Sequence, residues 1–252
     1  MDEIKKDKKY WGPIQTLLLS VFIFLFTQII VGLLINGYFS IRHFTPQQSQ
    51  NWINNSAMGL FIETLLIEAL TILSVWIFLK IKKVGFKKIG LYGLPVLKDL
   101  GYLVLGFVSY FVIYFISVSV LKALVPGFNI SQKQDLGIPS VAYGADLWLF
   151  FFMLVVLPPI AEEILFRGFL YTGLKQKLNK ILAALITSIA FAAPHLFETN
   201  SSLLWVAGLD TFILSMVLVY VREKTGRLWA GMGIHFLKNF VAFASLYLLH
   251  NS

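Results

Sequence analysis

The sequence contains no cysteine, and only 13% of its 252 residues are charged. The absence of cysteine excludes disulfide bonds, thiolate catalysis, cysteine-ligated zinc and a lipoprotein anchor. A soluble domain has about 25% charged and about 45–50% apolar residues, whereas 58% of this chain is hydrophobic. These proportions exclude an ordinary soluble enzyme and a disordered chain. They predict an all-α fold, a polytopic membrane helix bundle.

Seven apolar runs, most of them close to the ~20 residues that a membrane-crossing helix needs, predict about seven transmembrane helices. The runs are Ile14–Ile35, Met58–Leu79, Leu100–Leu121, Leu147–Tyr171, Ile181–His195, Leu203–Val221 and Leu228–Leu249. The fourth run contains Pro158 and Pro159, and the fifth is short and ends at Pro194 and His195. Irregular helices at membrane depth are tolerated where they line a cavity or pack inside protein. We therefore expect these two runs to line a cavity or to pack inside the protein.

The basic residues alternate between the two sides of the predicted bundle. Of the 21 Lys and Arg residues, 17 lie in the N-terminal tail and in every second loop, and three lie in the other loops. This positive-inside pattern predicts a multi-pass membrane protein with a cytoplasmic N-terminus and an external C-terminus. Because the charges flank apolar runs, the net charge of +8 indicates membrane topology and no nucleic-acid partner.

Ionisable side chains inside the spans are the informative residues, because each costs about 2.5–3.5 kcal/mol near the bilayer centre on insertion scales. They are Glu63, Glu68, Glu162, Glu163, His195, Asp210, His235 and Lys238. We expect Glu63, Glu68, Asp210 and Lys238 to be structural, with Lys238 pairing with an acid of another span or reaching the cytoplasmic side.

Glu162 and Glu163 follow the two prolines by a few residues, at the expected start of a helical piece. Glu163 and Arg167 are four residues apart and share a helix face, so they can pair. Glu162 is rotated by about 100° from Glu163 and is left free to accept a proton, as a general base must. The alternative is an ion-pair network that only locks helices together.

Two histidines also lie in the spans. His195 closes the segment Phe191–His195, and a lone histidine of this kind is more often a packing residue than a catalyst. His235 and Asn239 share a helix face and can both donate hydrogen bonds to an oxyanion, or can hold helices together. A carboxylate base, an imidazole and oxyanion donors are the parts that activate a water. The H-E-x-x-H and G-x-S-x-G motifs are absent.

These segments resemble the CAAX protease and bacteriocin-processing family of intramembrane endopeptidases. That family includes the type II CAAX prenyl endopeptidase and abortive-infection-like proteins. Its pattern is E-E-x-x-x-R, F-x-x-x-H and H-x-x-x-N or D on successive helices. Here the pattern is Glu162-Glu163-x-x-x-Arg167, Phe191-x-x-x-His195 and His235-x-x-x-Asn239, in that order. The resemblance divides the chain into N-terminal membrane helices with polar loops, 1–144, and catalytic membrane helices, 145–250.

The resemblance implies hydrolysis of a peptide bond at or in the membrane. It implies that Glu162 and His195 activate the water, that His235 and Asn239 stabilise the oxyanion, and that Glu163 and Arg167 orient the site. Zinc on Glu162, His195 and His235 is the alternative to a metal-free, glutamate-activated water, because imidazole and carboxylate suit both. We expect no tightly bound metal.

The expected substrate is a small membrane-associated protein or a peptide precursor. Maturation of a bacteriocin or peptide pheromone, or self-immunity by bacteriocin destruction, are the sharpest forms of this hypothesis. The alternative is a non-enzymatic membrane scaffold or immunity factor that binds a toxin or a sensor kinase. A third hypothesis is a small transporter, which predicts internal repeats that are not visible in the sequence.

Overall fold

The computed structural model describes residues 11–132, 142–197 and 203–249. Within these residues the chain is helical and has no strand; the only β-type pairing is an isolated bridge between Phe197 and Leu203. The predicted all-α membrane bundle is therefore confirmed. The N-terminal lysines counted in the charge pattern lie outside the described residues.

Five helical elements make up the N-terminal half. They are α1 (Pro13–Ile41), α2 (Pro46–Asn55), α3 (Ala57–Ile81), a 3-10 turn (Phe86–Ile89) and α4 (Leu97–Leu124). The sequence pattern did not predict α2, which lies in a polar stretch rich in Gln and Asn. A capping box explains why it forms, because the Thr45 hydroxyl accepts from the Gln48 backbone while the Gln48 side chain accepts from the Thr45 backbone.

The C-terminal half is built around one long irregular helix. It runs from Gly144 to Leu174 as α5 (Gly144–Phe151), a π-helical segment (Phe152–Val156), α6 (Leu157–Glu162), a second π-helical segment (Glu163–Leu170) and α7 (Tyr171–Leu174). There follow α8 (Lys180–Ala192), a 3-10 turn (Ala193–Leu196), α9 (Trp205–Thr225), α10 (Trp229–Phe243) and a π-helical segment (Ala244–Leu248).

Five of these helices are long and apolar enough to cross a membrane. They are α1, α3, α4, the helix Gly144–Leu174 and α9, while α8 with its 3-10 turn and α10 are shorter apolar helices. All seven predicted apolar runs thus form helices, and the chain is a multi-pass membrane protein. The predicted count of seven spans and the orientation remain predictions.

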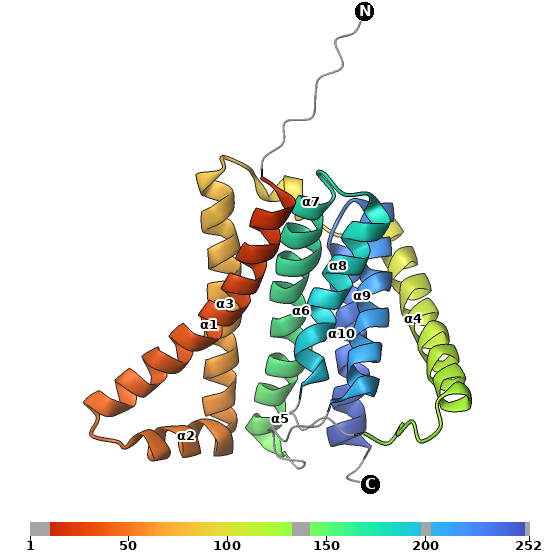
Figure 1. The fold of residues 1–252 in the computed structure, drawn as a ribbon. Coiled ribbons are helices and arrows are strands. Elements are labelled where there is room, and N and C mark those ends of the chain that lie inside the picture. The colour runs from red at the N-terminus through yellow and green to blue at the C-terminus, as the bar shows by residue number, and fades with distance from the viewer. Residues whose placement is uncertain (1–10, 133–141, 198–202, 250–252) are drawn as a thin grey trace, which may run out of the picture.

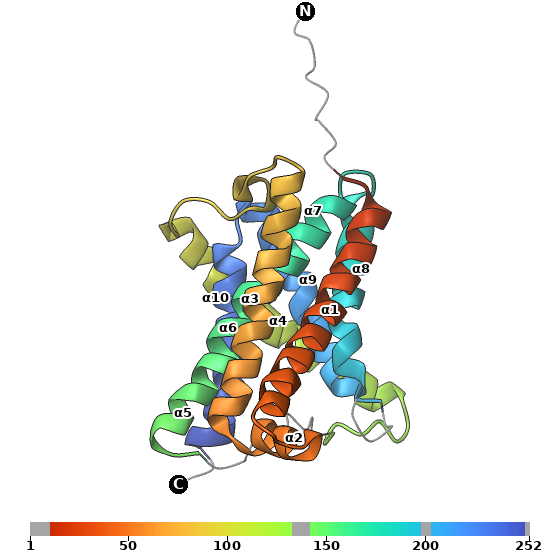
Figure 2. The same ribbon diagram turned by 90° about the vertical axis from the view of Figure 1, so that its left-hand side faces the viewer.

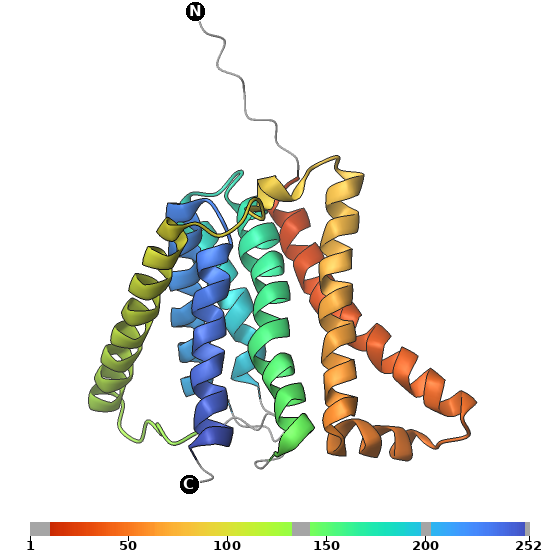
Figure 3. The same cartoon turned by 180° about the vertical axis from the view of Figure 1, so that it is seen from behind.

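The central helices pack together and the outer helices flank them. From behind, α6 and α10 lie between α4 and α3 (Figure 3), and α4 lies on the opposite side of the bundle from α1 and α3 (Figure 1). After a quarter turn, α1 and α3 are seen side by side in front of the central helices (Figure 2). The helix Gly144–Leu174 and α9 are far more buried than α3 and α4. The outer helices present exposed Leu, Phe, Ile and Val side chains, as a lipid-facing surface does.

Candidate active site

The backbone around the two prolines changes helix type without interrupting the helix. The π-helical segment Phe152–Val156 ends where α6 begins, and Pro158 and Pro159 lie in the first turn of α6. The prolines were predicted to begin a new helical piece; in the structure the helix type changes next to them, but the chain stays helical from Gly144 to Leu174. Single π-helical turns occur frequently at functional sites. Glu162 is the last residue of α6, and Glu163 is the first residue of the second π-helical segment.

Glu163 and Arg167 form the predicted pair. Arg167 Nη1 donates to Glu163 Oε1 at 2.7 Å, and both residues are fully buried. The Arg167 guanidinium also lies over the Phe191 ring, 4.2 Å from its centroid. On the opposite side α10 approaches closely at Gly231, where a Cβ would lie 3.0 Å from Glu163 Oε2. Glu163 is therefore held in one position, with its charge compensated.

His235 lies between the two glutamates. Its Nε2 is 3.6 Å from Glu162 Oε2, and its Nδ1 is 3.5 Å from Glu163 Oε1. The imidazole is 4% exposed, and the Phe191 ring packs edge-on against it with the centroids 5.8 Å apart. The His235 ring thus contacts both Glu163, which is paired with Arg167, and Glu162, which is not.

His195 lies in the 3-10 turn Ala193–Leu196, directly after α8. Its Nδ1 is 3.2 Å from the carbonyl oxygen of Phe191. A carbonyl oxygen only accepts, so this contact requires the proton on Nδ1 and leaves Nε2 of the neutral ring as an acceptor. The His195 ring also contacts the Phe191 ring, with centroids 5.6 Å apart, and His195 interacts electrostatically with Glu162.

A cavity of about 250 Å³ brings together most of the predicted residues. Its polar lining includes Glu162, His195, His235, Lys238 and Asn239. Glu163 and Arg167 do not line it and lie behind Glu162 and His235. The short fifth run therefore supplies His195 to the same cavity as the proline-containing run, as the irregularity of both runs indicated. Glu162 retains 25% exposure of its side chain, consistent with access from the cavity.

Asn239 has a backbone partner that the sequence did not indicate. Its Nδ2 donates to the carbonyl oxygen of Leu154 at 2.9 Å. This amide connects α10 to the π-helical segment before the prolines. Asn239 thus contacts the segment before the prolines, while His235, one turn earlier on α10, contacts both glutamates.

Lys238 is a cavity residue outside the family pattern. Its Nζ pairs with Asp210 Oδ2 on α9 at 3.1 Å, and the Tyr110 hydroxyl of α4 donates to Asp210 Oδ1. The expectation that Lys238 pairs with an acid from another span is confirmed. Its place in the cavity could have been inferred from its position three residues after His235, on nearly the same helix face.

Glu68, like Lys238, lies outside the family pattern and interacts with a site residue. It lies on α3, which packs against α6, and it interacts electrostatically with Glu162. No hydrogen bond or ion pair of Glu68 occurs among the described residues. The sequence analysis predicted a structural role for both Glu68 and Glu63, because neither belongs to the family pattern. Glu63 shows no interaction with the cavity residues in the described part of the chain.

The candidate zinc ligands share the cavity but do not converge on one point. Among the described residues, no group of three or more His, Asp or Glu side chains is arranged to hold a metal ion. His235 instead turns one ring nitrogen to each glutamate. As arranged, Glu162, His195 and His235 do not fit a zinc ion, and no step below is routed through one.

One family model matches the part of the chain that contains this site. The family model described as "Type II CAAX prenyl endopeptidase Rce1-like" matches residues 144–241, from the first residue of α5 into α10. This part of the chain is therefore similar to the Rce1-like domains of a protease family, which confirms the resemblance noted in the sequence. The matched segment contains all six predicted site residues. No curated protein and no solved structure matches the chain.

Proposed function

We propose that this protein is an intramembrane endopeptidase that hydrolyses a peptide bond with a water activated by Glu162 and His195. One observation carries the proposal. Of the two adjacent glutamates, Glu163 is neutralised by Arg167 at 2.7 Å, while Glu162 faces the cavity that His195 also lines. A carboxylate that is not bound to arginine, next to an imidazole acceptor, is suited to remove a proton from water.

The reaction follows from these positions. A water in the cavity donates to Glu162 and to Nε2 of His195, and Glu162 takes one proton as the oxygen attacks the substrate carbonyl carbon. The C–N bond then breaks, the proton returns to the leaving amine nitrogen, and the second water proton is lost to the base. The products are a new carboxylate and a new amine, so one water is consumed for each bond cleaved.

His235 and Asn239 are the proposed oxyanion donors. Both line the cavity on the side of α10. Asn239 Nδ2 carries two hydrogens, one of which binds Leu154, so the second is available to a substrate oxygen. Removing one oxyanion donor typically costs about 10²–10³ in kcat. Glu163 and Arg167 hold His235 in place from behind.

The proposed substrate is a small membrane-associated protein or a peptide precursor, processed at the plasma membrane of a bacterium. The biological roles that we propose for this cleavage are maturation of a bacteriocin or peptide pheromone, or self-immunity by destruction of a bacteriocin. Apolar side chains such as Leu154, Phe243 and Leu246 make up much of the cavity wall, which supports an apolar stretch next to the cleaved bond. The Lys- and Arg-rich loops support a cytoplasmic N-terminus.

The decisive test compares Glu162→Gln with Glu63→Gln. Both changes replace a membrane glutamate by a near-isosteric amide, but only Glu162 lines the cavity. Membrane and secreted peptides from cells carrying each variant at equal abundance are profiled by mass spectrometry. We expect a product peptide to disappear and its longer precursor to accumulate only with Glu162→Gln.

Identical peptide profiles in all strains, with a cellular phenotype that persists in Glu162→Gln, would contradict the protease proposal. The non-enzymatic scaffold or immunity factor would then be the better account, since its contacts survive a conservative change. Metal analysis of the active purified protein tests the further proposal that no tightly bound metal is used; stoichiometric zinc in active preparations would overturn it.

A further inference from the structure

A second polar pocket, of about 500 Å³, lies at the Lys- and Arg-rich end of the bundle and shares no lining residue with the catalytic cavity. We call it the basic pocket; its polar lining is Lys87, Lys88, Tyr92 and Arg222. No carboxylate lines it. A group that enters it therefore meets positive charge on the loop after α3 and on the last turn of α9.

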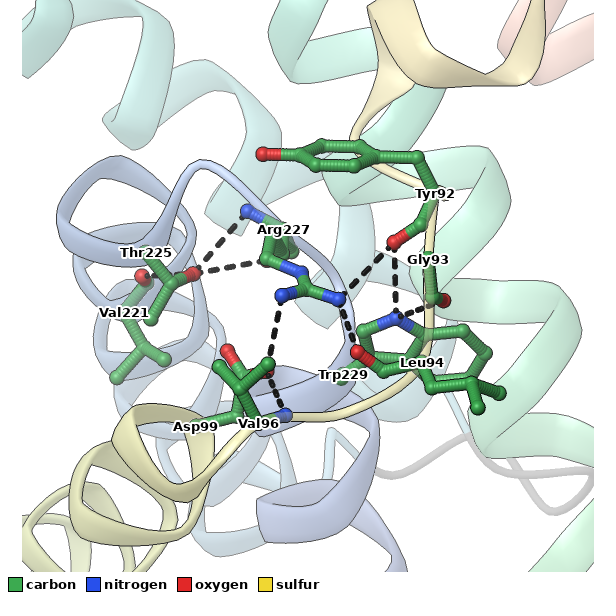
Figure 4. A network of polar contacts seen from close by, with 9 residues as sticks. All are labelled: Tyr92, Gly93, Leu94, Val96, Asp99, Val221, Thr225, Arg227 and Trp229. Carbon is green, nitrogen blue, oxygen red and sulfur yellow. Dashed lines mark hydrogen bonds and ion pairs between the residues drawn. The ribbon is translucent and has the colours of Figure 1, made fainter.

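Arg222 differs from an ordinary membrane-flanking charge. It is only 7% exposed, its Nε is buried without a hydrogen-bond partner, and it forms no ion pair within the described part of the chain. Arg227, five residues later, also has a buried Nε without a hydrogen-bond partner, but its terminal nitrogens are engaged: Nη2 donates to the carbonyl oxygens of Tyr92, at 3.1 Å, and Leu94, and Nη1 lies 3.7 Å from Asp99 Oδ2 (Figure 4). A buried guanidinium needs a compensating partner, and among the described residues no side-chain hydrogen bond or ion pair supplies one for Arg222.

The backbone is shaped to leave this guanidinium in place. Gly90 has a φ of +88°, and a Cβ there would lie 2.5 Å from Arg222 Cζ. The adjacent acid, Glu223, does not neutralise Arg222 through a contact, because its carboxylate pairs with Lys175 and with Lys180, the latter at 2.7 Å. The positive charge of Arg222 is thus available to an external anion.

We propose that the basic pocket binds the phosphate group of an anionic phospholipid such as phosphatidylglycerol. The pocket lies where α3 and α9 end, at the depth of the lipid headgroups for helices that cross the bilayer. Arg222 would bind the phosphate oxygens with its planar fork, and the exposed Lys87 and Lys88 would lie at the rim. Basic pockets between helices on the cytoplasmic side bind such headgroups. This proposal does not depend on the proteolytic activity.

Occupancy of the basic pocket would stabilise the catalytic helices. Ile89, next to Gly90, is fully buried, and its side chain lies 3.4 Å from where a Cβ of Gly168 would stand in the π-helical segment of Glu163. The Gly90 carbonyl accepts from the Leu228 amide at 3.0 Å, directly before α10. A lipid that fixes this loop therefore fixes two elements of the active site, and we expect it to raise the unfolding temperature.

The test uses the full chain purified in a neutral detergent. Bound lipid is counted by native mass spectrometry, and the unfolding temperature is followed during titration with phosphatidylglycerol, phosphatidylcholine or inorganic phosphate. Lys87→Gln/Lys88→Gln removes two charges from the pocket. Lys80→Gln/Lys83→Gln removes one charge from the last turn of α3 and one from the loop after it, both outside the pocket. Both double variants alter exposed side chains, so both are expected to fold.

The wild-type chain and the Lys80/Lys83 variant should retain phosphatidylglycerol in preference to phosphatidylcholine. The Lys87/Lys88 variant should bind it about 25-fold more weakly, because each basic residue near an anionic surface contributes roughly a fivefold factor. Equal losses in the two double variants would show a diffuse charge effect and overturn the proposal. Stabilisation by inorganic phosphate equal to that by phosphatidylglycerol would overturn the assignment to a lipid.

Discussion

The side-chain amide of Asn239 on α10 donates to the backbone carbonyl oxygen of Leu154, 2.9 Å away, in the π-helical segment before the prolines. In an α-helix this carbonyl would accept from the amide of residue 158, and in a π-helix from that of residue 159. Both positions are proline, which has no N–H. Asn239 therefore supplies the donor that the Pro158-Pro159 sequence removes.

Replacing Asn239 by alanine should lower both stability and activity. The Leu154 carbonyl would lose its donor at a part-buried position, which costs about 1–3 kcal/mol. The unfolding temperature of the purified variant measures the first effect, and peptide cleavage measures the second. An unchanged unfolding temperature with abolished cleavage would mean that Asn239 acts on the substrate alone and does not brace the proline segment.

The Glu163–Arg167 pair should behave as a unit. Arg167→Met alone leaves a buried carboxylate without its cation, and breaking a buried pair costs about 3–5 kcal/mol. Glu163→Gln/Arg167→Met should recover much of that stability while remaining impaired in cleavage, since His235 loses its charged neighbour. Thermal unfolding of Glu163→Gln, Arg167→Met and the double variant gives the coupling free energy between the two side chains. Additive losses of stability would contradict a direct interaction.

Gly231→Ala tests how closely α10 must approach Glu163. The added Cβ would lie 3.0 Å from Glu163 Oε2, so the carboxylate must move by a few tenths of an ångström and His235 with it. Since displacement of about 1 Å in a catalytic geometry costs about 10²-fold, we expect cleavage to fall by about tenfold. Gly101→Ala is the matched control, because nothing lies within 4 Å of its added Cβ. Equal activities in the two variants would refute the argument.

The Asp210–Lys238 pair at the cavity wall should also show coupling. Lys238→Met leaves Asp210 with the Tyr110 hydroxyl as its remaining donor among the described residues. Loss of a hydrogen bond to a charged group costs about 1.5–3 kcal/mol. Adding Asp210→Asn removes the unpaired charge and should restore part of that loss, as measured by unfolding temperature. If Asp210→Asn deepens the loss instead, Asp210 has a function beyond holding Lys238.

The predicted orientation can be tested by cysteine labelling, because the chain has no cysteine of its own. Lys83→Cys reports the loop after α3, and Gln50→Cys reports α2 at the opposite end of α3. Gln50 is preferable to its neighbour Ser49, which is 1% exposed. With a membrane-impermeant reagent on intact cells, we expect only Gln50→Cys to react. Labelling of Lys83→Cys alone would reverse the proposed topology.

The sequence by itself determined the class of fold and pointed to four of the polar residues that line the cavity, namely Glu162, His195, His235 and Asn239. Long apolar runs have one favourable solution in lipid, because every backbone polar group must be bonded within its own helix. The helices therefore follow from composition alone. Spacing along one helix was equally decisive, since Glu163 and Arg167 must share a face when they are four residues apart.

The contacts between side chains on different helices were decided only by the tertiary structure. The positions of His235 between two glutamates and of Lys238 on Asp210 depend on how helices rotate and cross. Those rotations are fixed by side-chain packing and by close approaches such as that at Gly231, which no local pattern encodes. The same holds for Arg222, a flanking charge by sequence, which packs against the loop at Gly90 as a buried cation without an ion pair among the described residues.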